Sequence, residues 1–268
     1  MNWMKKVAVA LVCLLPLGLQ AAKVDTLQVK SPSMNKSIEV VVVSPDVAAT
    51  KACPVIYLLH GYGGNARTWV GIKPDLSKIA DEKGIFFVCP DGKNTWYWDS
   101  PLNADVRYET FISDELVKYV DSHYKTVADR KGRAITGLSM GGHGAMWNGL
   151  RHSDVFSAAG STSGGVDIRP FPKNWEMSVQ IGEKAKYPEN WEKYTVINLV
   201  PTLRKDQIAL IFDCGDSDFF LEVNKNYHEA LLKQGIDHDF ITRPGNHDSQ
   251  YWNNSIAVSY THLTLPTT

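Results

Sequence analysis

The chain has 268 residues, of which 44% are hydrophobic and 21% charged, so it is long enough for one large globular domain and too apolar to be disordered. Its 28 Lys and Arg residues against 29 Asp and Glu residues give a formal net charge of −1, and without a basic run we expect no nucleic-acid partner. The four cysteines form no Cys-x-x-Cys pair and the histidines show no metal-ligand spacing, so we expect no metal site and no cofactor.

The N-terminal segment predicts export. Lys5 and Lys6 precede an almost continuously apolar run over residues 7–19, and the small side chains of Ala21 and Ala22 suit a cleavage site. Because this run is shorter than the ~20 residues that span a bilayer, we predict a signal peptide over residues 1–22 rather than a membrane anchor. We therefore expect a periplasmic or secreted protein without stable membrane association after cleavage.

Strands and helices alternate along the rest of the chain. Runs rich in apolar and β-branched residues predict strands, and apolar residues at helical spacing, some followed by glycine, predict helices. The predicted strands cover residues 23–29, 37–43, 54–59, 85–89, 133–136, 158–161, 208–214 and 237–242. The predicted helices cover residues 74–83, 109–124, 141–151, 222–234 and 250 onward.

This order predicts one α/β domain over residues 23–260, with a mostly parallel central sheet and helices on both of its faces. The first two strands are expected to form an antiparallel pair at a sheet edge. Residues 164–198 are irregular, which is typical of an insertion, and Trp175 and Trp191 within them either form a wall or pack in the core. Residues 261–268 lack a helical pattern and are predicted to be a non-native or disordered tail.

Three cysteines follow the predicted signal peptide: Cys53, Cys89 and Cys214. An odd number leaves at least one thiol unpaired, and each of the three adjoins an apolar run. We predict buried, inert thiols and leave their pairing open.

A Gly-Leu-Ser-Met-Gly motif at residues 137–141 follows a predicted strand and opens a helix rich in small residues. This is the setting of a nucleophile elbow, where small neighbours allow a strained serine to project from a tight turn. The motif predicts Ser139 as a nucleophile. An ordinary glycine-rich turn is the alternative, and the downstream loops argue against it.

A serine hydroxyl needs a base, and in this topology an acid and then a histidine follow the serine. His247 lies in a loop directly after the last predicted strand, whereas the other downstream histidines fall on helices, in a strand or in the C-terminal segment. For the acid, Asp218 lies further into its loop than Asp216, and Asp213 is still on the strand. We predict Asp218, with Asp216 in reserve, as the group that orients His247.

Acyl transfer also needs donors for the developing oxyanion, and preorganised backbone amides supply them. Met140 follows the nucleophile at the start of a helix, and the His-Gly-Tyr-Gly-Gly loop at residues 60–64 follows a buried strand. We predict the amides of Met140 and Tyr62 as the oxyanion hole. A phosphate-binding loop is the alternative, but no Gly-Lys-Ser or Gly-Lys-Thr follows.

Aromatic residues are abundant, with 8 Trp and 11 Tyr, and some stand near the expected site. Trp96 and Trp98 follow a strand whose loop is expected at the carboxyl edge of the sheet. They either stack on a sugar or aryl group or pack in the core. With His60, they are our candidate substrate-binding residues.

Taken together, these motifs resemble the esterase D branch of the α/β-hydrolases, which includes S-formylglutathione hydrolases, tributyrin esterases, feruloyl and acetyl xylan esterases, and mycolyltransferases. The resemblance spans roughly residues 30–252. Its motifs are Leu-Leu-His-Gly-Tyr-Gly-Gly at 58–64, Gly-Leu-Ser-Met-Gly-Gly at 137–142, Cys-Gly-Asp-Ser-Asp at 214–218, Gly-Asn-His-Asp at 245–248 and Tyr-Trp at 251–252. It implies an α/β-hydrolase fold and the same triad and oxyanion amides as the residues themselves suggest. The last eight residues resemble nothing in the family.

The predicted function is that of a secreted serine carboxylesterase that hydrolyses acyl esters, most notably acetyl or feruloyl groups on carbohydrate, through an acyl-enzyme. The export signal favours this over the family's cytosolic thioesterases of the S-formylglutathione hydrolase type. An acyltransferase with the same triad, a serine peptidase and a non-catalytic carbohydrate-binding relative stay open as alternatives. The expected partner is a small-molecule or polysaccharide ester, and the oligomeric state stays open.

Overall fold

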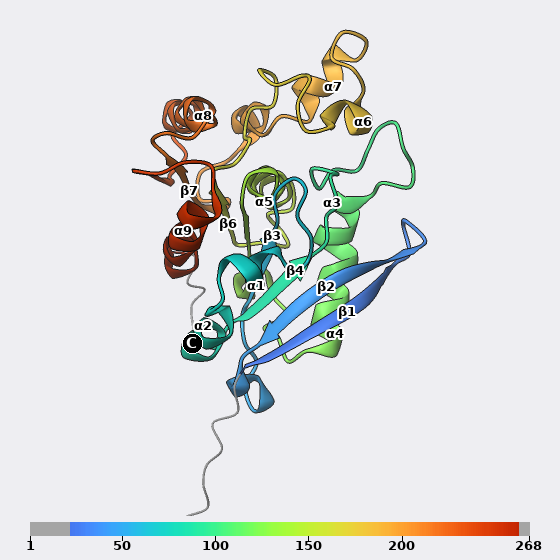
Figure 1. Cartoon of the computed structure of the whole chain (residues 1–268), viewed down its shortest axis with the longest axis vertical. Helices are drawn as coiled ribbons and strands as arrows, with labels where there is room; N and C mark the ends of the chain where they lie inside the picture. Colours follow the sequence, from blue (N-terminus) through green and yellow to red (C-terminus); the bar gives the residue numbers. More distant parts are fainter. Residues whose placement is uncertain (1–21, 263–268) are drawn as a thin grey trace, which may run out of the picture.

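A computed structural model describes residues 22–262 of the chain (Figure 1). The predicted signal peptide thus lies outside the described residues except for Ala22. The predicted tail also lies outside them, except for residues 261 and 262, which continue the last helix. Among the described residues, no helix is both long and apolar enough to cross a membrane.

The strands form a single mixed sheet of eight strands in the order β1-β2-β4-β3-β5-β6-β7-β8. Their bounds are Lys23–Ser31 (β1), Lys36–Ser44 (β2), Val55–Leu59 (β3), Phe86–Pro90 (β4), Arg133–Gly137 (β5), Ala158–Thr162 (β6), Ala209–Gly215 (β7) and Asp239–Arg243 (β8). β1 and β2 pair antiparallel at one edge, β2 pairs antiparallel with β4, and the other neighbours are parallel. The predicted mostly parallel sheet with an antiparallel edge pair is confirmed.

Helices cover both faces of this sheet, as predicted (Figure 1). Their bounds are Thr68–Ile72 (α1), Leu76–Lys83 (α2), Tyr108–Thr110 (α3), Leu116–His123 (α4), Met140–Arg151 (α5), Met177–Ile181 (α6), Pro188–Lys193 (α7), Leu221–Gln234 (α8) and Ser249–His262 (α9). A π-helical segment joins α3 to α4, so that the two run as the one helix expected from sequence. Short 3-10 helices occupy Asp46–Ala49, Arg130–Gly132 and Val196–Thr202.

Period-two alternation explains the two layers, because successive side chains of a strand point to opposite faces. In β2, Val40 and Val42 join the core cluster that contains the apolar faces of α4, α5 and α8. Val41 and Val43 join the other cluster, with side chains of α1, α2 and α9. All four valines are fully buried. Because both faces of this strand are covered, its sequence is a continuous apolar run rather than an alternation of apolar and polar residues.

Residues 164–198 form a cap beyond the carboxyl ends of the strands, seen at the top of Figure 1 with α6 and α7. Trp191 is fully buried in this cap, and its indole N–H donates to the Gly182 carbonyl at 2.9 Å. Trp175 is only partly buried. Of the two tryptophans, Trp191 therefore packs in the core, and Trp175 is the one that contributes to a wall.

The turn between β5 and α5 is built on very close backbone contact. A Cβ atom added to Gly141 would lie 2.2 Å from the Leu59 carbonyl oxygen, and one added to Gly137 would lie 2.4 Å from the Gly141 carbonyl oxygen. No side chain fits at either position without moving the backbone. The glycines of the motif are therefore required by packing between β3, β5 and α5.

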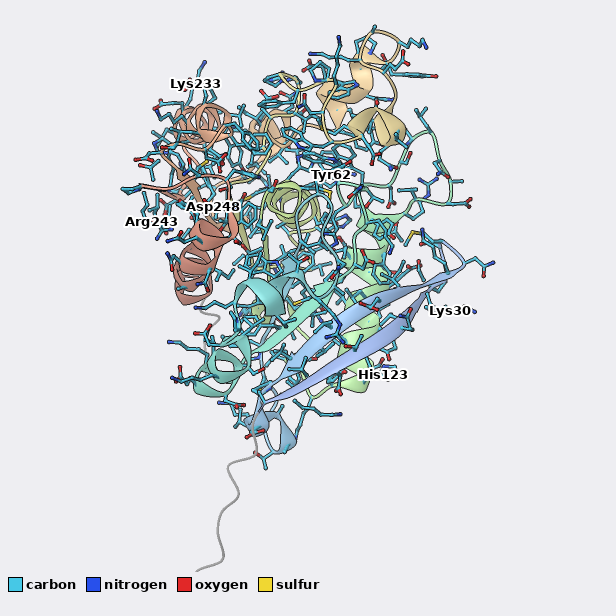
Figure 2. All side chains as sticks on the ribbon, viewed as in Figure 1. Lys30, Tyr62, His123, Lys233, Arg243 and Asp248 are labelled. Atoms are coloured by element: carbon cyan, nitrogen blue, oxygen red, sulfur yellow. The ribbon has the colours of Figure 1, made fainter. Side chains whose placement is uncertain are left out.

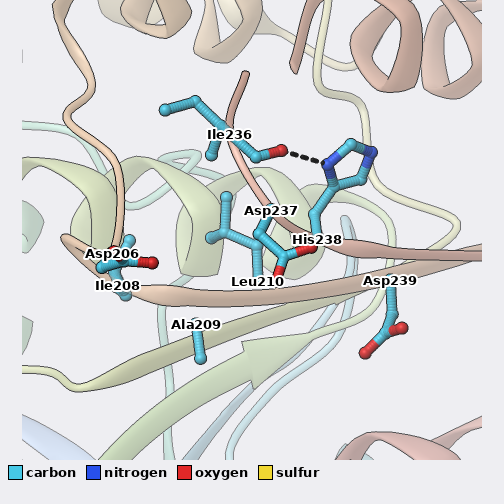
Figure 3. Close-up of a pocket in the computed structure, with 8 residues that line it drawn as sticks. All are labelled: Asp206, Ile208, Ala209, Leu210, Ile236, Asp237, His238 and Asp239. Atoms are coloured by element: carbon cyan, nitrogen blue, oxygen red, sulfur yellow. Dashed lines mark hydrogen bonds between the residues drawn. The ribbon is translucent and has the colours of Figure 1, made fainter. Parts of the chain in front are cut away.

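A pocket of about 310 Å³ lies at the opposite, amino-terminal ends of β7 and β8 (Figure 3). It is lined by Asp206, Ile208, Ala209, Leu210, Ile236, Asp237, His238 and Asp239. The Nδ1 atom of His238 lies 2.8 Å from the Ile236 carbonyl oxygen and therefore donates to it. This pocket is separated from the motif-bearing loops by the length of the strands.

The close contact at Gly141 predicts a large difference between two glycine substitutions. Gly141→Ala should lower the free energy of unfolding by about 1–3 kcal/mol, because the methyl group overlaps the backbone of β3. Gly71→Ala serves as the control: Gly71 lies in α1 with open space around the added Cβ, so the change should be neutral or stabilise by up to ~1 kcal/mol. Urea unfolding of both variants measures the difference, and equal stabilities would contradict the packing argument.

Candidate active site

Four loops that carry the sequence motifs meet at the carboxyl edge of the parallel strands. They follow β3 (residues 60–64), β5 (Ser139), β7 (residues 216–218) and β8 (residues 244–248). Parallel strands end at the same edge of a sheet, so residues distant in sequence come together there. Figure 2 shows Tyr62 and Asp248, from the first and last of these loops, on either side of α5.

Ser139 stands at the elbow between β5 and α5 with φ 54° and ψ −117°, a region that non-glycine residues rarely occupy. Hydrogen bonds hold this conformation on both sides: the Ser139 N–H donates to the Thr162 carbonyl at 2.9 Å, and its carbonyl accepts from the His143 N–H at 3.0 Å. The side chain remains partly exposed. The elbow predicted from the motif is present.

Ser139, His247 and Asp218 lie in one hydrogen-bonded chain. The Nε2 atom of His247 is 2.9 Å from Ser139 Oγ, across 108 residues of sequence, and its Nδ1 atom is 2.8 Å from Asp218 Oδ2. Because a carboxylate only accepts, Nδ1 carries the proton and Nε2 is free to accept from the serine hydroxyl. The Asp218 side chain is fully buried, and its other oxygen accepts from the Phe220 N–H at 2.8 Å.

The two other aspartates of this region have different contacts. Asp216, the reserve candidate, is exposed, and its Oδ1 accepts from the Gly245 N–H at 3.2 Å and so tethers the His247 loop. Asp213 is buried on β7 and accepts hydrogen bonds from Thr162 and Ser255, which connects it to α9. Burial raises the pKa of Asp213. Neither residue contacts His247 in the described hydrogen bonds, so the choice of Asp218 agrees with the geometry.

Met140 directly follows Ser139, and the loop that carries Tyr62 passes close to the same serine, since a Cβ atom added to Gly61 would lie 3.3 Å from Ser139 Cβ. Met140 is the first residue of α5, where an N–H group has no partner within the helix and the helix dipole adds partial positive charge. Among the hydrogen bonds of residues 22–262, no protein acceptor is recorded for the Tyr62 N–H. Both amides are therefore available to an oxygen atom at the site.

His60 lies beneath this loop and not at a substrate surface, which corrects its assignment as a substrate-binding residue. Its side chain is only 1% exposed. Its Nε2 atom accepts from the Gly92 N–H at 2.8 Å, so Nδ1 carries the proton and donates to the Gly61 carbonyl at 2.7 Å. Both ring nitrogens are thus used within the protein.

Trp96 and Trp98 also require correction, because core packing is the alternative that the structure shows. They are 1% and 0% exposed and stack on each other with ring centroids 5.6 Å apart. The Trp98 indole donates to His143 Nε2 at 2.8 Å, and the Trp96 indole donates to the Trp175 carbonyl at 3.2 Å. Both indole side chains point into the core, and the backbone at Trp96 and Tyr97 has left-handed φ angles there. The sequence does not reveal this conformation.

The aromatic ring nearest to His247 is that of Phe219, which in turn stacks on Trp175. Trp252 and Phe220 also contact the imidazole, at 5.0 and 5.5 Å between ring centroids. Phe219 is 51% exposed, and its ring centroid lies 4.3 Å from that of His247. Sequence reasoning missed Phe219, although its place directly after the Asp216-Ser217-Asp218 loop was a usable signal. For Trp175 the sequence left two alternatives open, a wall or packing in the core.

Asn94 joins the cap to the loop at residues 60–64. The Asn94 side chain accepts from the Gly63 N–H at 2.9 Å and donates to Glu176 at 3.3 Å. Burial, together with a hydrogen bond to Glu176 and its negative charge, raises the pKa of the Tyr62 phenol. Glu176 and the neighbouring Trp175 both have left-handed φ angles, so this corner of the cap is strained and held by its contacts.

The remaining candidates for reactive chemistry are inert. Cys53, Cys89 and Cys214 are buried, as predicted, and all three are unpaired, which the sequence left open. Burial raises the pKa of each thiol. Among residues 22–262, no group of three or more His, Cys, Asp or Glu side chains is arranged to hold a metal ion. The groups that the hydrogen bonds bring together at the carboxyl edge are a hydroxyl, an imidazole and a carboxylate.

This fold and this edge are those of an α/β-hydrolase that cleaves carboxylic esters. The family model described as "Putative esterase" matches residues 31–263, and the chain belongs to this family.

Individual relatives agree with the family. An acetyl esterase of Caldicellulosiruptor saccharolyticus is 26% identical over 223 residues, which cover 76% of this chain and 81% of the relative. The S-formylglutathione hydrolase of Rattus norvegicus is 22% identical over 250 residues, covering 78% and 87%. A solved ferulic acid esterase superposes with a TM-score of 0.77 at 29% identity, covering 91% of this chain and 99% of that structure.

His143, buried behind the elbow, predicts a pH dependence of stability. Burial lowers its pKa from 6.5 to about 4 and outweighs the hydrogen bond from Nδ1 to the Gly165 carbonyl. The unfolded chain therefore binds a proton that the folded chain does not. Above about pH 6.5 the His143 titration does not affect the free energy of unfolding. As the pH falls from 6.5 towards 4, protonation of the unfolded chain lowers this free energy, by about 2 kcal/mol at pH 5.

His143→Gln removes this titration while keeping an acceptor for the Trp98 indole. The free energy of unfolding is measured in urea at pH 7 and at pH 5. Between these two pH values it should fall by about 2 kcal/mol less in His143→Gln than in the wild type. His123→Gln, at an exposed position, is the control and should keep the wild-type difference. The same pH difference in all three proteins would show that His143 is not the buried group responsible.

Proposed function

We propose that the protein is an exported serine carboxylesterase that removes acetyl or feruloyl groups from carbohydrate through an acyl-enzyme at Ser139. The observation that carries the proposal is the hydrogen-bonded chain from Ser139 through His247 to Asp218. Partial exposure of Ser139 gives a substrate access to the hydroxyl.

In the first half-reaction, Ser139 Oγ attacks the ester carbonyl carbon while its proton moves to His247 Nε2. The carbonyl oxygen becomes an oxyanion, which the N–H groups of Tyr62 and Met140 stabilise. The carbon–oxygen bond to the alcohol then breaks as His247 gives the proton to the leaving oxygen. Asp218 stabilises the imidazolium and keeps its orientation throughout, without itself taking the proton.

In the second half-reaction, water takes the place of the alcohol. His247 Nε2 accepts a proton from the water as its oxygen attacks the acyl carbon, and the same two amides stabilise the second oxyanion. The bond to Ser139 Oγ breaks, and His247 returns the proton to that oxygen. The products are the carboxylic acid and the regenerated enzyme.

His60 supports this chemistry by orienting one peptide plane. The Gly61 carbonyl and the Tyr62 N–H belong to the same planar peptide unit and point in opposite directions. A hydrogen bond from His60 to that carbonyl therefore fixes the direction of the N–H group on the other side. The Gly64 N–H donates to the same carbonyl at 3.0 Å. The Tyr97 hydroxyl donates a hydrogen bond to the His60 carbonyl at 3.0 Å.

The acyl group and the location are supported by similarity and by sequence pattern. The acetyl esterase and ferulic acid esterase similarities favour acetyl and feruloyl groups. The apolar run over residues 7–19 after Lys5 and Lys6 supports export to the periplasm or the medium. A thioesterase of the S-formylglutathione hydrolase type is the second candidate, because such an enzyme is among the relatives.

The central test compares Ser139→Ala, Asp218→Asn and Asp216→Asn on acetylated and feruloylated xylan fragments. Ser139→Ala should lower kcat by about 10⁴-fold or more, and Asp218→Asn by about 10³- to 10⁴-fold because the histidine tautomer is no longer fixed. Asp216→Asn keeps an acceptor oxygen for the Gly245 N–H and should stay within about tenfold of the wild type. The measurement is steady-state release of acetate and ferulate.

Two outcomes would contradict the proposal. Turnover that survives in Ser139→Ala would place the nucleophile elsewhere. Faster turnover of S-formylglutathione than of either carbohydrate ester would favour the thioesterase.

The role of His60 predicts a difference between two amide substitutions. The amide of Asn can occupy the place of Nδ1 and still donate to the Gly61 carbonyl, whereas the amide of Gln reaches the place of Nε2 and leaves that carbonyl without its side-chain donor. His60→Gln should therefore lower kcat on the order of tenfold more than His60→Asn, with similar KM values. Kinetics with one acetate ester measure this, and equal kcat values would reject the orienting role.

A further inference from the structure

We propose that Phe219, backed by Trp175, binds the alcohol part of the ester, so that the enzyme prefers alcohols that present a flat, uncharged ring face, such as a pyranose. This inference rests on the proposed esterase function and names the substrate class of the same site. It assigns the preference to the leaving group, whereas the names of the relatives describe the acyl group.

The first argument is the exposure of Phe219. Most of the large aromatic side chains near the site are buried, whereas Phe219 is 51% exposed at the rim of the triad. It stacks on Trp175 with ring centroids 5.6 Å apart and an interplanar angle of 22°. An exposed aromatic face beside a reactive group is a common form of binding surface.

The second argument is rigidity. Trp175 is in ring contact with Phe171 and Phe220, and its carbonyl accepts from the indole of Trp96. Phe219 is in addition held edge-on against Phe220, with centroids 4.6 Å apart. A surface that is already ordered loses little conformational entropy when a ligand binds.

The third argument is position relative to the proton path. His247 must give its proton to the leaving oxygen, which therefore lies within about 3 Å of Nε2 in the productive complex. The Phe219 ring is beside that same imidazole, at 4.3 Å between centroids. Trp252 and Phe220 also contact this imidazole, but of the three rings Phe219 is the nearest and the exposed one. In the proposed complex the first atoms of the alcohol therefore lie against Phe219, while the carbonyl oxygen faces the amides of Tyr62 and Met140.

The fourth argument is charge. Acidic residues outnumber basic ones beside the aromatic pair in sequence. The exposed ionisable residues within three positions of Phe219 or Trp175 are Asp216, Glu222 and Glu176 against Lys173. Their net negative charge disfavours an anionic leaving group such as glutathione and leaves a neutral ring as the fitting class.

The test uses ester pairs that differ only in the alcohol or only in the acyl group. Benzyl acetate and a monoacetylated methyl xyloside are each compared with ethyl acetate, and ethyl cinnamate is compared with ethyl acetate. Phe219→Ala should lower the ratio of kcat/KM for the ring alcohols over ethyl acetate on the order of fivefold to tenfold, mainly through KM. Phe219→Tyr retains the ring face and should restore the ratio.

Leu232→Ala is the matched control, because Leu232 is 54% exposed on α8 and has no ring to offer. It should keep the wild-type ratio. A purely structural role of Phe219 in holding His247 would lower kcat for every ester alike and leave the ratios unchanged, which would overturn the inference. A loss confined to ethyl cinnamate would also overturn it, because the ring would then belong to the acyl group.

Failure of the proposed function has a different signature. In that case the wild-type protein would hydrolyse none of the esters in a Ser139-dependent way. If hydrolysis depends on Ser139 but the alcohol ratios ignore Phe219, the esterase stands and the inference alone is rejected.

Discussion

The whole site depends on the close approach of α5 to β3. Gly141 lies so near the Leu59 carbonyl that no side chain is tolerated, and this contact sets how tightly the chain turns after β5. The turn forces Ser139 into a left-handed conformation that L-residues rarely adopt. Such strain persists only where neighbouring contacts fix it, and here the Ser139 amide and carbonyl are both hydrogen-bonded. Packing energy is thus used to hold one hydroxyl at the carboxyl edge of the sheet.

The parallel sheet then explains how remote residues reach that hydroxyl. His247 is 108 residues from Ser139, and Asp218 is 29 residues from His247. Each nevertheless lies just beyond the carboxyl end of a parallel strand of the same sheet, namely β5, β7 or β8. The loops are also tied to one another, since Asp216 accepts from the Gly245 N–H and the Ser217 N–H donates to the Gly245 carbonyl. The positions of the acid and the base are therefore coupled by backbone hydrogen bonds as well as by the triad itself.

Sequence predicted the strands, the elbow, and the residues that now form the hydrogen-bonded chain, because these follow from local pattern and strand order. It did not predict which way side chains of the neighbouring loops point. Trp96 and Trp98 lie on the expected loop but turn into the core, since left-handed backbone angles at Trp96 and Tyr97 redirect the chain there. Phe219 was missed for the converse reason: adjacent Phe219 and Phe220 look alike in sequence, and only the folded loop exposes the first and buries the second.

Three histidines surround the elbow, and their hydrogen bonds and burial separate their roles. His60 accepts from the Gly92 N–H and donates to the Gly61 carbonyl, so it has no nitrogen left for a substrate. His143 is used in the same way by Trp98 and Gly165, and burial lowers its pKa to about 4, which keeps it neutral. Only in His247 does one nitrogen face a carboxylate and the other a partly exposed hydroxyl. A histidine can act as a base at this edge only if its second nitrogen faces a reacting group. In His60 and His143 both ring nitrogens are already hydrogen-bonded within the protein.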